Sequence, residues 1–239
     1  MPGMVIGSHP PGDDIAHKWQ CTPAEAIEIQ RRLAAMVIIG GPGKIDSIAG
    51  IDLAFEKSRN LGFCAILVLE FPSLRVIEER CVAGETAFPY VPGLLSFREG
   101  PLIMKAYNML DKKPGCIMCD GQGIAHPRRL GIASHMGLVL GVPSIGCAKS
   151  RLFGRHEEPG PERGAKSFLS DDKGVPVGLV LRTRKGVKPV FVSPGQRVGI
   201  EEAGDIVMAC AGRYRVPEPT RLADIRVENY KREYLRTCS

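Results

Sequence analysis

The sequence Cys116-Ile-Met-Cys-Asp-Gly-Gln-Gly123 decides the fold, because it joins a short apolar strand to an acidic residue and then to a glycine-containing turn. A second stretch, Ile48-Ala-Gly-Ile-Asp52, also ends an apolar strand with a carboxylate, and Glu99 and Asp224 lie in helix-like segments. A folded core would deliver these charges to one edge. Gathered carboxylates repel each other unless a hard cation lies between them, and oxygen ligands suit Mg²⁺. We therefore expect a magnesium site, and a basic protein that holds Mg²⁺ most naturally acts on phosphate.

Strand and helix patterns alternate on both sides of this stretch. We predict strands over residues 47–55, 61–70, 74–81, 117–119, 144–148, 177–182 and 189–193. We predict helices over residues 23–36, 96–110, 130–140, 200–212 and 220–236, the first of them capped by Thr22. Phe71-Pro-Ser73 is typical of a hairpin turn, and residues 154–174, which are polar and rich in Gly and Pro, are expected to form a flexible loop.

Three strands that pair locally, followed by alternating helices and strands, indicate an α/β domain with a central mixed sheet flanked by helices. Carboxylates on the first and fourth strands match the arrangement of ribonuclease H-like proteins. This analogy of topology fixes no substrate.

The 239 residues are enough for one well-buried core. Residues 1–20 carry no periodicity, so we expect a flexible N-terminal tail followed by a single domain over residues 21–239. A net charge of +6 permits attraction to nucleic acid without requiring it. No apolar run approaches the roughly 18 residues that span a bilayer, and the N-terminus lacks a signal-peptide pattern. We expect a cytoplasmic protein.

The eight cysteines lie mostly in apolar stretches. Cys116 and Cys119 form a CxxC pair, but no second pair completes a zinc site. Residues three apart on a strand point to opposite faces, which is poor geometry for a shared ligand. We expect buried thiols in a reducing compartment.

The motifs between residues 84 and 152 occur in a distinctive order. They are Pro89-Tyr-Val-Pro-Gly93, Leu95-Ser-Phe-Arg-Glu-Gly-Pro101, Asp120-Gly-Gln-Gly-Ile-Ala-His-Pro-Arg-Arg129, Gly131-Ile-Ala-Ser-His-Met-Gly137 and Pro143-Ser-Ile-Gly-Cys-Ala-Lys-Ser150. Together with Gly50-Ile-Asp52 and Pro217-Glu-Pro-Thr-Arg-Leu-Ala-Asp224, this series resembles the endonuclease V family over residues 22–230.

The resemblance implies a ribonuclease H-like fold and an endonuclease that depends on Mg²⁺, with Mn²⁺ as a substitute. It further implies hydrolysis of the second phosphodiester bond 3′ to deoxyinosine in damaged DNA, which leaves 3′-hydroxyl and 5′-phosphate ends. The biological role would be repair of deaminated adenine. The expected partner is therefore inosine-containing DNA.

The resemblance assigns catalytic roles to five residues. Asp52, Glu99 and Asp120 would hold the metal, and Asp224 would be a further ligand or would position water. Lys149 would stabilise developing negative charge or hold the scissile phosphate. Each has a plainer alternative. Asp52 and Asp120 could be surface residues that begin a turn, and Glu99 could favour a helix start. An Asp in a C-terminal helix, such as Asp224, and a lone Lys in a loop are usually solvated.

Lesion recognition requires a base to leave the stack. Tyr90, held between two prolines, resembles the wedge that fills the gap left by a flipped nucleotide. By the same resemblance, Leu95, Gly121 and Ile132 would contact the hypoxanthine.

Four basic residues lie in the two motifs between Asp120 and Gly137, and one of them has two competing interpretations. His126 would contact the flipped nucleotide or its phosphate, or it is a core histidine bonded to a carbonyl. Arg128 and Arg129 suit phosphate contacts. His135 is interpreted as structural.

Other functions stay open at this point. The chain could be an inosine-specific endoribonuclease. The choice between DNA and RNA depends on contacts to the 2′-hydroxyl, and the sequence does not locate these contacts. It could be another ribonuclease H-like nuclease acting on hybrid or branched substrates, or a catalytically silent nucleic-acid binding module. No obligate protein partner is expected, and a monomer is the default.

Overall fold

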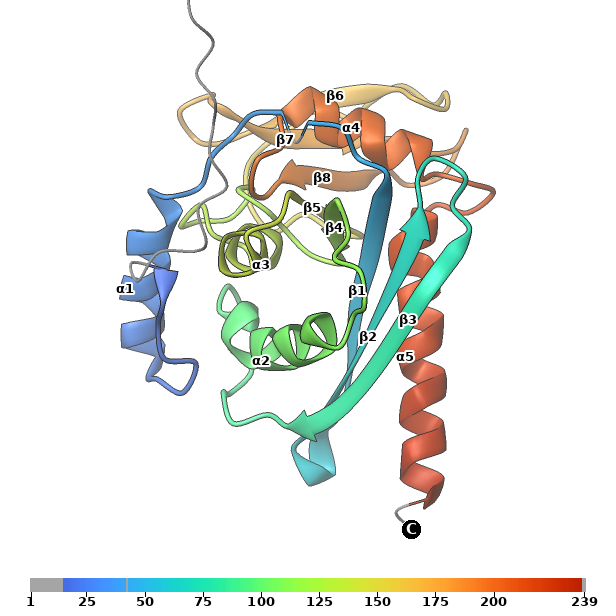
Figure 1. Ribbon diagram of the computed structural model, residues 1–239. Coiled ribbons are helices and arrows are strands. Elements are labelled where there is room, and N and C mark those ends of the chain that lie inside the picture. The colour runs from blue at the N-terminus through green and yellow to red at the C-terminus, as the bar shows by residue number, and fades with distance from the viewer. Residues whose placement is uncertain (1–14, 42, 238–239) are drawn as a thin grey trace, which may run out of the picture.

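The computed structural model describes residues 15–41 and 43–237. They form an eight-stranded mixed sheet with helices on both faces (Figure 1), so the predicted α/β class is confirmed. The strand order is β3-β2-β1-β4-β5-β8-β7-β6. The strands are β1 (Ser47–Glu56), β2 (Leu61–Glu70), β3 (Val76–Glu85), β4 (Cys116–Cys119), β5 (Ser144–Ala148), β6 (Lys166–Ser170), β7 (Pro176–Leu181) and β8 (Val190–Pro194), and a short 3-10 helix, η2 (Lys57–Arg59), follows β1.

The middle of the sheet is parallel and its two sides are antiparallel. β1 pairs antiparallel with β2 and parallel with β4, which in turn pairs parallel with β5. Ile51 lies opposite Cys119 in the last pair between β1 and β4. One residue further along each strand comes an acid, Asp52 or Asp120. The parallel register therefore brings these two carboxylates to the same edge of the sheet.

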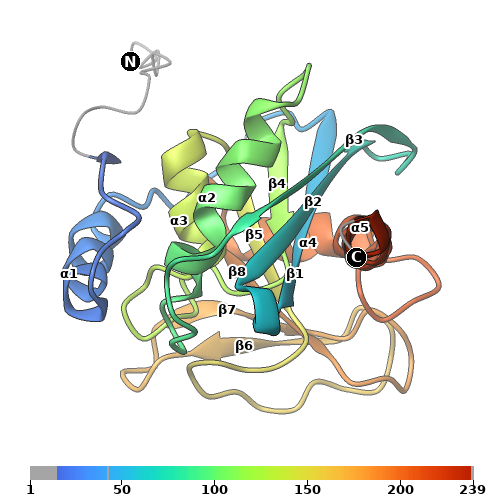
Figure 2. The ribbon, with the colours of Figure 1, turned by 90° about the horizontal axis from the view of Figure 1, so that it is seen from below.

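Helices cover both faces of this sheet (Figure 2). α2 (Leu95–Asn108) and α3 (Ile132–Leu140) lie on one face, and α4 (Ile200–Ala209) and α5 (Glu218–Thr237) lie on the other. α1 (Pro23–Ala34) packs outside α3. Cys116 and Met118 enter the core under α4 and α5, whereas Ile117 and Cys119 enter the core under α2 and α3. A strand buried on both faces has no polar side, which explains why the β4 sequence is apolar throughout.

The edge strand β6 corrects one prediction. Residues 154–174 were expected to form a flexible loop, but Lys166–Ser170 pairs antiparallel with β7. Only Leu169 of β6 is buried, while Lys166 and Phe168 are exposed. An edge strand that buries one side chain gives a weak pattern, and its polar residues resemble a loop. β3 likewise begins and ends later than the predicted 74–81.

Residues 15–20 correct a second prediction, because they pack on the domain and do not belong to a free tail. The Trp19 ring stacks on the His135 ring at 5.1 Å between centroids. A Cβ atom at Gly100 would lie 2.3 Å from the Trp19 ring, so the glycine makes room for the indole. The packing of Trp19 could not be predicted, because a single aromatic residue outside any helix or strand gives no periodic pattern. Residues 1–14 lie outside the described residues.

The seven described cysteines are free thiols, and Cys238 lies outside the described part of the chain. Cys116 and Cys119 point to opposite faces of β4, as predicted. Burial raises the pKa of both thiols. Within residues 15–41 and 43–237, no helix is long and apolar enough to cross a membrane.

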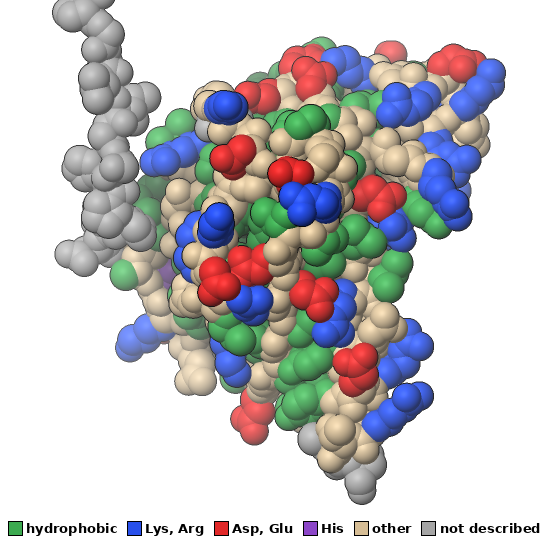
Figure 3. Space-filling view, turned by 45° about the vertical axis from the view of Figure 1, so that its right-hand side comes forward, with side chains coloured by type: hydrophobic (Ala, Val, Ile, Leu, Met, Phe, Trp, Pro, Cys, Tyr) green, Lys and Arg blue, Asp and Glu red, His purple; other side chains and the backbone are tan. Residues whose placement is uncertain are grey.

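Charges are mixed on the face that carries α5. Figure 3 shows Lys and Arg interspersed with Asp and Glu there. Arg226 pairs with Glu79 at 3.1 Å and with Glu233 at 3.6 Å, and Lys231 lies 3.7 Å from Glu56. The positive excess of the chain is therefore not gathered on this face.

Candidate active site

Three acids line a small cavity of about 200 Å³ beside the middle of β1 and the carboxyl end of β4. Asp52 and Asp120 come from these strands, and Glu99 reaches the cavity from α2. Ile103 and Ile132 complete the wall beneath them. The cavity is enclosed by rigid elements, and all its polar side chains are carboxylates.

These carboxylates disfavour one another's charge. Burial, the negative charge of Asp120 and the neighbouring Asp224 raise the pKa of Asp52 to about 8, against a hydrogen bond that Leu53 N–H donates to Asp52 Oδ1 at 2.9 Å. Burial and the charges of Asp52 and Asp120 also raise the pKa of Glu99 to about 8. A cation among these oxygens would relieve the repulsion.

Asp224 approaches this group from α5 on the other face. Gly50 makes the approach possible, since a Cβ atom there would lie 1.9 Å from the carbonyl oxygen of Pro219 at the start of α5. Asp224 is exposed, contacts Asp52 through its side chain, and raises the pKa of that carboxyl. It does not line the small cavity. Asp224 therefore stands at the margin of the acid group.

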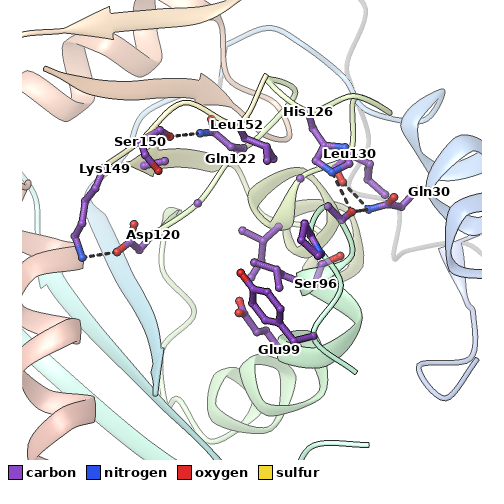
Figure 4. A pocket seen from close by; sticks show the side chains of 18 residues that line it. Gln30, Ser96, Glu99, Asp120, Gln122, His126, Leu130, Lys149, Ser150 and Leu152 are labelled. Carbon is purple, nitrogen blue, oxygen red and sulfur yellow. Dashed lines mark hydrogen bonds and ion pairs between the residues drawn. The ribbon is translucent and has the colours of Figure 1, made fainter. Parts of the chain in front are cut away.

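Lys149 lies beside Asp120 at the end of β5. Its Nζ atom is 2.7 Å from Asp120 Oδ2 (Figure 4). Partial burial lowers the pKa of Lys149, but the hydrogen bond to Asp120 and the charges of Asp120, Asp224 and Asp52 outweigh it and raise that pKa. The ammonium group is therefore held protonated next to the acids.

A larger cavity of about 410 Å³ adjoins the acidic one, and Glu99, Asp120 and Ile132 line both. The three residues predicted to contact the base, Leu95, Gly121 and Ile132, all line it. A Cβ atom at Gly121 would lie 2.6 Å from the Ile132 side chain, so only glycine keeps this wall open. Tyr90 also lines the cavity and is 71% exposed.

The sequence analysis gave no site role to several residues that line this cavity, among them Gln30, Gln122, Ser150 and Leu152. Gln122 Nε2 donates to the Ser150 carbonyl at 3.1 Å and so ties β4 to the loop after β5 (Figure 4). Leu152 is 47% exposed and lines the cavity. Its position three residues after Lys149 was the one feature of the sequence that could have indicated a site role. Gln30 gave no signal, because a glutamine in an amphipathic helix is usually solvated.

His126 forms an internal contact, which favours the carbonyl-bonded alternative. The side chain is 1% exposed. Its Nδ1 accepts the Arg128 amide N–H at 3.1 Å, and its Nε2 donates to the Gly93 carbonyl at 3.0 Å. Burial and the charge of Arg128 lower the pKa of His126 to about 4. The ring is neutral at pH 7 and both its nitrogens are engaged.

The two arginines after His126 are also engaged within the protein. Arg128 donates from Nε to Gln30 Oε1 at 2.5 Å and from Nη2 to the Gly93 carbonyl at 2.9 Å. Arg129 pairs with Asp171 at 2.5 Å. A guanidinium has five N–H donors, and these bonds use two of them in Arg128 and one in Arg129. Both arginines therefore keep donors for the predicted phosphate contacts.

His135 is fully buried in α3, and its Nδ1 lies 2.8 Å from Ser96 Oγ, which fits its structural interpretation. Among residues 15–41 and 43–237, no group of three or more His, Cys, Asp or Glu side chains is already arranged for a metal ion. Asp120 is directed to Lys149, which accounts for the loose arrangement. Asp52 and Glu99 have raised pKa values, and Asp120 is paired with Lys149. These three carboxylates nevertheless suit a hard divalent cation.

Comparisons with known proteins agree with this geometry. Residues 31–225 match the family model described as Endonuclease V. Endonuclease V of Trichormus variabilis is 47% identical over 215 residues, which cover 89% of this chain and 97% of that protein. The crystal structure of endonuclease V from Streptomyces avermitilis has a TM-score of 0.86 and 42% identity, and covers 91% of this chain and 96% of that one.

A more distant relative carries a nucleic acid. Endonuclease V of Ciona intestinalis is 25% identical, with a TM-score of 0.79 over 88% of this chain and 98% of that chain. Its crystal structure is a complex with a 24mer DNA that contains an inosine followed by a ribo-adenosine.

Proposed function

The chain belongs to the endonuclease V family and is a hydrolytic endonuclease, and we propose that it cleaves DNA strands that contain deoxyinosine. One observation carries the proposal: Glu99, Asp120 and Ile132 form a shared wall between the two cavities. A base held in the larger cavity would keep its strand next to the acids. The inosine-containing complex of the Ciona relative supports this substrate.

The chain is a metal-dependent nuclease, and we assign Mg²⁺ to it, with Mn²⁺ as a substitute. Asp52, Glu99 and Asp120 would hold the ion, with Asp224 at the margin. When bound, the ion supplies Lewis-acid activation of water and neutralises charge on the phosphate. Lys149 keeps a positive charge beside Asp120, where it would stabilise the charge that develops on the scissile phosphate.

The larger cavity would receive the flipped base. Leu95, Gly121 and Ile132 form an apolar and backbone-lined wall, and backbone groups there can distinguish the O6 acceptor and N1 donor of hypoxanthine from adenine. Tyr90 projects at the rim and would fill the gap in the stack. Extrusion of a mispaired base costs a few kcal/mol, less than extrusion of a sound one.

The expected cut is at the second phosphodiester bond 3′ to the lesion, in a single domain acting as a monomer. RNA containing inosine is the second candidate substrate. The rival nuclease activity on hybrid or branched substrates has no need for a base-sized cavity beside the acids. The cytoplasmic location stays a prediction.

The test is cleavage of matched DNA duplexes and single-stranded RNAs, each with one inosine, with and without Mg²⁺. Inosine-free strands and the Asp120→Asn variant are the controls. We expect Mg²⁺-dependent cutting one nucleotide beyond the inosine in DNA. Cutting confined to RNA would replace DNA as the substrate, and cutting without regard to inosine would overturn the assignment of the larger cavity.

A further inference from the structure

We propose that Gln30, on the helix α1, is a positioning residue for the segment 86–94 that carries Tyr90, and thereby sets how tightly the enzyme holds an inosine-containing strand. The inference rests on the proposed function, because it gives Tyr90 a role in lesion binding. Gln30 touches no reacting group. It acts through the Gly93 carbonyl at the end of the Tyr90 segment.

The Tyr90 segment is an arch held at its two ends. At one end, Arg98 donates from Nη1 to the Phe88 carbonyl at 2.7 Å, and Phe88 is buried. At the other end, Leu94 is buried and its N–H donates to the Val91 carbonyl at 2.9 Å. Tyr90 lies exposed between these ends. The position of its ring therefore depends on how firmly the ends are fixed.

The second end is fixed by three donors that meet on one oxygen. The Gly93 carbonyl accepts from Gln30 Nε2 at 2.9 Å and from His126 Nε2 at 3.0 Å (Figure 4). It also accepts from Arg128 Nη2 at 2.9 Å. Gly93 has φ +79°, and a Cβ atom there would lie 3.1 Å from Arg128 Nη2. A left-handed backbone and a crowded carbonyl leave this residue little freedom.

Gln30 holds the donors of this group together. Gln30 is 1% exposed, and both the oxygen and the nitrogen of its side-chain amide form hydrogen bonds. Oε1 accepts from Arg128 Nε, which fixes the orientation of the amide, and Nε2 donates to Gly93 and to the Leu130 carbonyl at 3.1 Å. Leu130 precedes α3, whose first residue Ile132 lines both cavities. Gln30 thus links the Tyr90 segment to the opposite wall of the base cavity.

The placement of α1 is consistent with a supporting role. Phe88 and Leu94 pack with Ala26 and with the partly buried Ile27 of α1. The helix carries no side chain of the acid group, and Gln30 precedes residue 31, where the family match begins. The link is therefore made by a residue outside the matched segment.

The test is kinetic, with two variants and a matched control. Gln30→Glu keeps an acceptor for Arg128 but loses both donated hydrogen bonds, and Gln30→Met loses all three at similar volume. Gln20→Glu makes the same charge change at an exposed glutamine outside this group. We expect KM for inosine-containing duplex to rise roughly tenfold in both Gln30 variants, with kcat within about twofold, and no change in Gln20→Glu. Thermal unfolding checks that each variant is folded.

A double-variant experiment separates positioning from general stability. In a Tyr90→Ala background, Gln30→Glu should raise KM by less than about twofold further, because the group it positions is gone. The fluorescence of 2-aminopurine next to the inosine should report less unstacking in Gln30→Glu than in the wild type. A kcat loss as large as the KM change, or effects that multiply fully in the double variant, would overturn the inference. Absence of inosine-directed cleavage by the wild type would instead overturn the proposed function.

Discussion

The two ends of the site differ in how their polar groups are satisfied. Around the acidic cavity, Asp52 and Glu99 repel each other and Asp120, and burial adds to the cost of their charges. Around the Gly93 carbonyl, three donors meet one acceptor and each of their side chains makes a further hydrogen bond. The difference shows which end of the site is preorganised. The hydrogen bonds of the Gly93 end are complete without ligand, whereas the acidic end favours either protonation of its carboxyls or a bound cation.

The largest effect should come from Asp120, which lines both cavities together with Glu99. Asp120→Asn removes a ligand charge and the partner of Lys149, so cleavage should fall by at least about a thousandfold. The fold should persist, because like-charge repulsion falls as well. Nicking assays and circular dichroism measure the two quantities. Near-wild-type cleavage by a folded variant would contradict the catalytic role.

Stability should reveal the cost of charging Asp52, which comes first from burial and then from the neighbouring acids. The folded-state pKa of Asp52 is raised to about 8, so the folded protein binds more protons than the unfolded chain between about pH 4 and 8. This contribution is complete at low pH and is lost as pH rises through about 8. In EDTA at pH 8.5, Asp52→Asn should therefore exceed the wild type in stability by on the order of 3 kcal/mol.

The control for this prediction is the pH trend itself. Urea unfolding at pH 6 and pH 8.5 should give a steeper loss for the wild type than for Asp52→Asn. Added Mg²⁺ should reduce the wild-type loss. Identical pH trends in the two proteins would mean that the pKa of Asp52 is not raised by its surroundings.

The Gly93 end should respond to pH with the opposite sign. The pKa of His126 is lowered to about 4, so the unfolded chain binds the proton first and stability is lost as pH falls from about 6.5 to 4. His126→Gln retains a donor for Gly93 and an acceptor for Arg128. From pH 6.5 to 4, the unfolding free energy of His126→Gln should therefore fall by about 2 kcal/mol less than that of the wild type. Equal losses in both proteins would show that the ring is not held neutral.

The smallest effect should come from the backbone at Gly93. Gly93→Ala should cost about 1 to 2 kcal/mol of stability, because φ is +79° and the new Cβ meets Arg128. Gly174 has the same φ with open space around it, so Gly174→Ala isolates the backbone cost. Only Gly93→Ala should also weaken binding of inosine-containing duplex in a filter-binding assay. Equal binding losses would remove the special role of this carbonyl.

Sequence patterns predicted most of the fold because buried strands carry them strongly. β1, β2, β4 and β5 are apolar runs that end at turns, and the parallel register follows from their order. The edge strand β6 was missed, since it buries little and presents polar residues. The packing of Trp19 was missed because it depends on the space above Gly100, which no local pattern records.

The candidate site divides in the same way. Apolar segments marked Asp52, Asp120, Glu99 and Asp224, although Asp52 lies inside β1 and not at its end. The resemblance added Lys149 and the roles of all five residues. Gln30 could not be predicted, because its partners Gly93, Leu130 and Arg128 are distant in sequence and come together only in the folded chain. Every residue type has a backbone carbonyl, so hydrogen bonds to carbonyls leave no pattern in the sequence.

The contact between Gly50 and Pro219 has a consequence for synthesis. β1 comes before α5 in the chain by more than 150 residues, yet its face away from α2 is covered by α5, which is made later. On the ribosome, the apolar residues of β1 and β2 on that face stay uncovered until α5 has emerged, which makes the nascent chain prone to association during this interval. Asp224 joins the other acids only at that moment, so a half-made chain is not yet a complete nuclease.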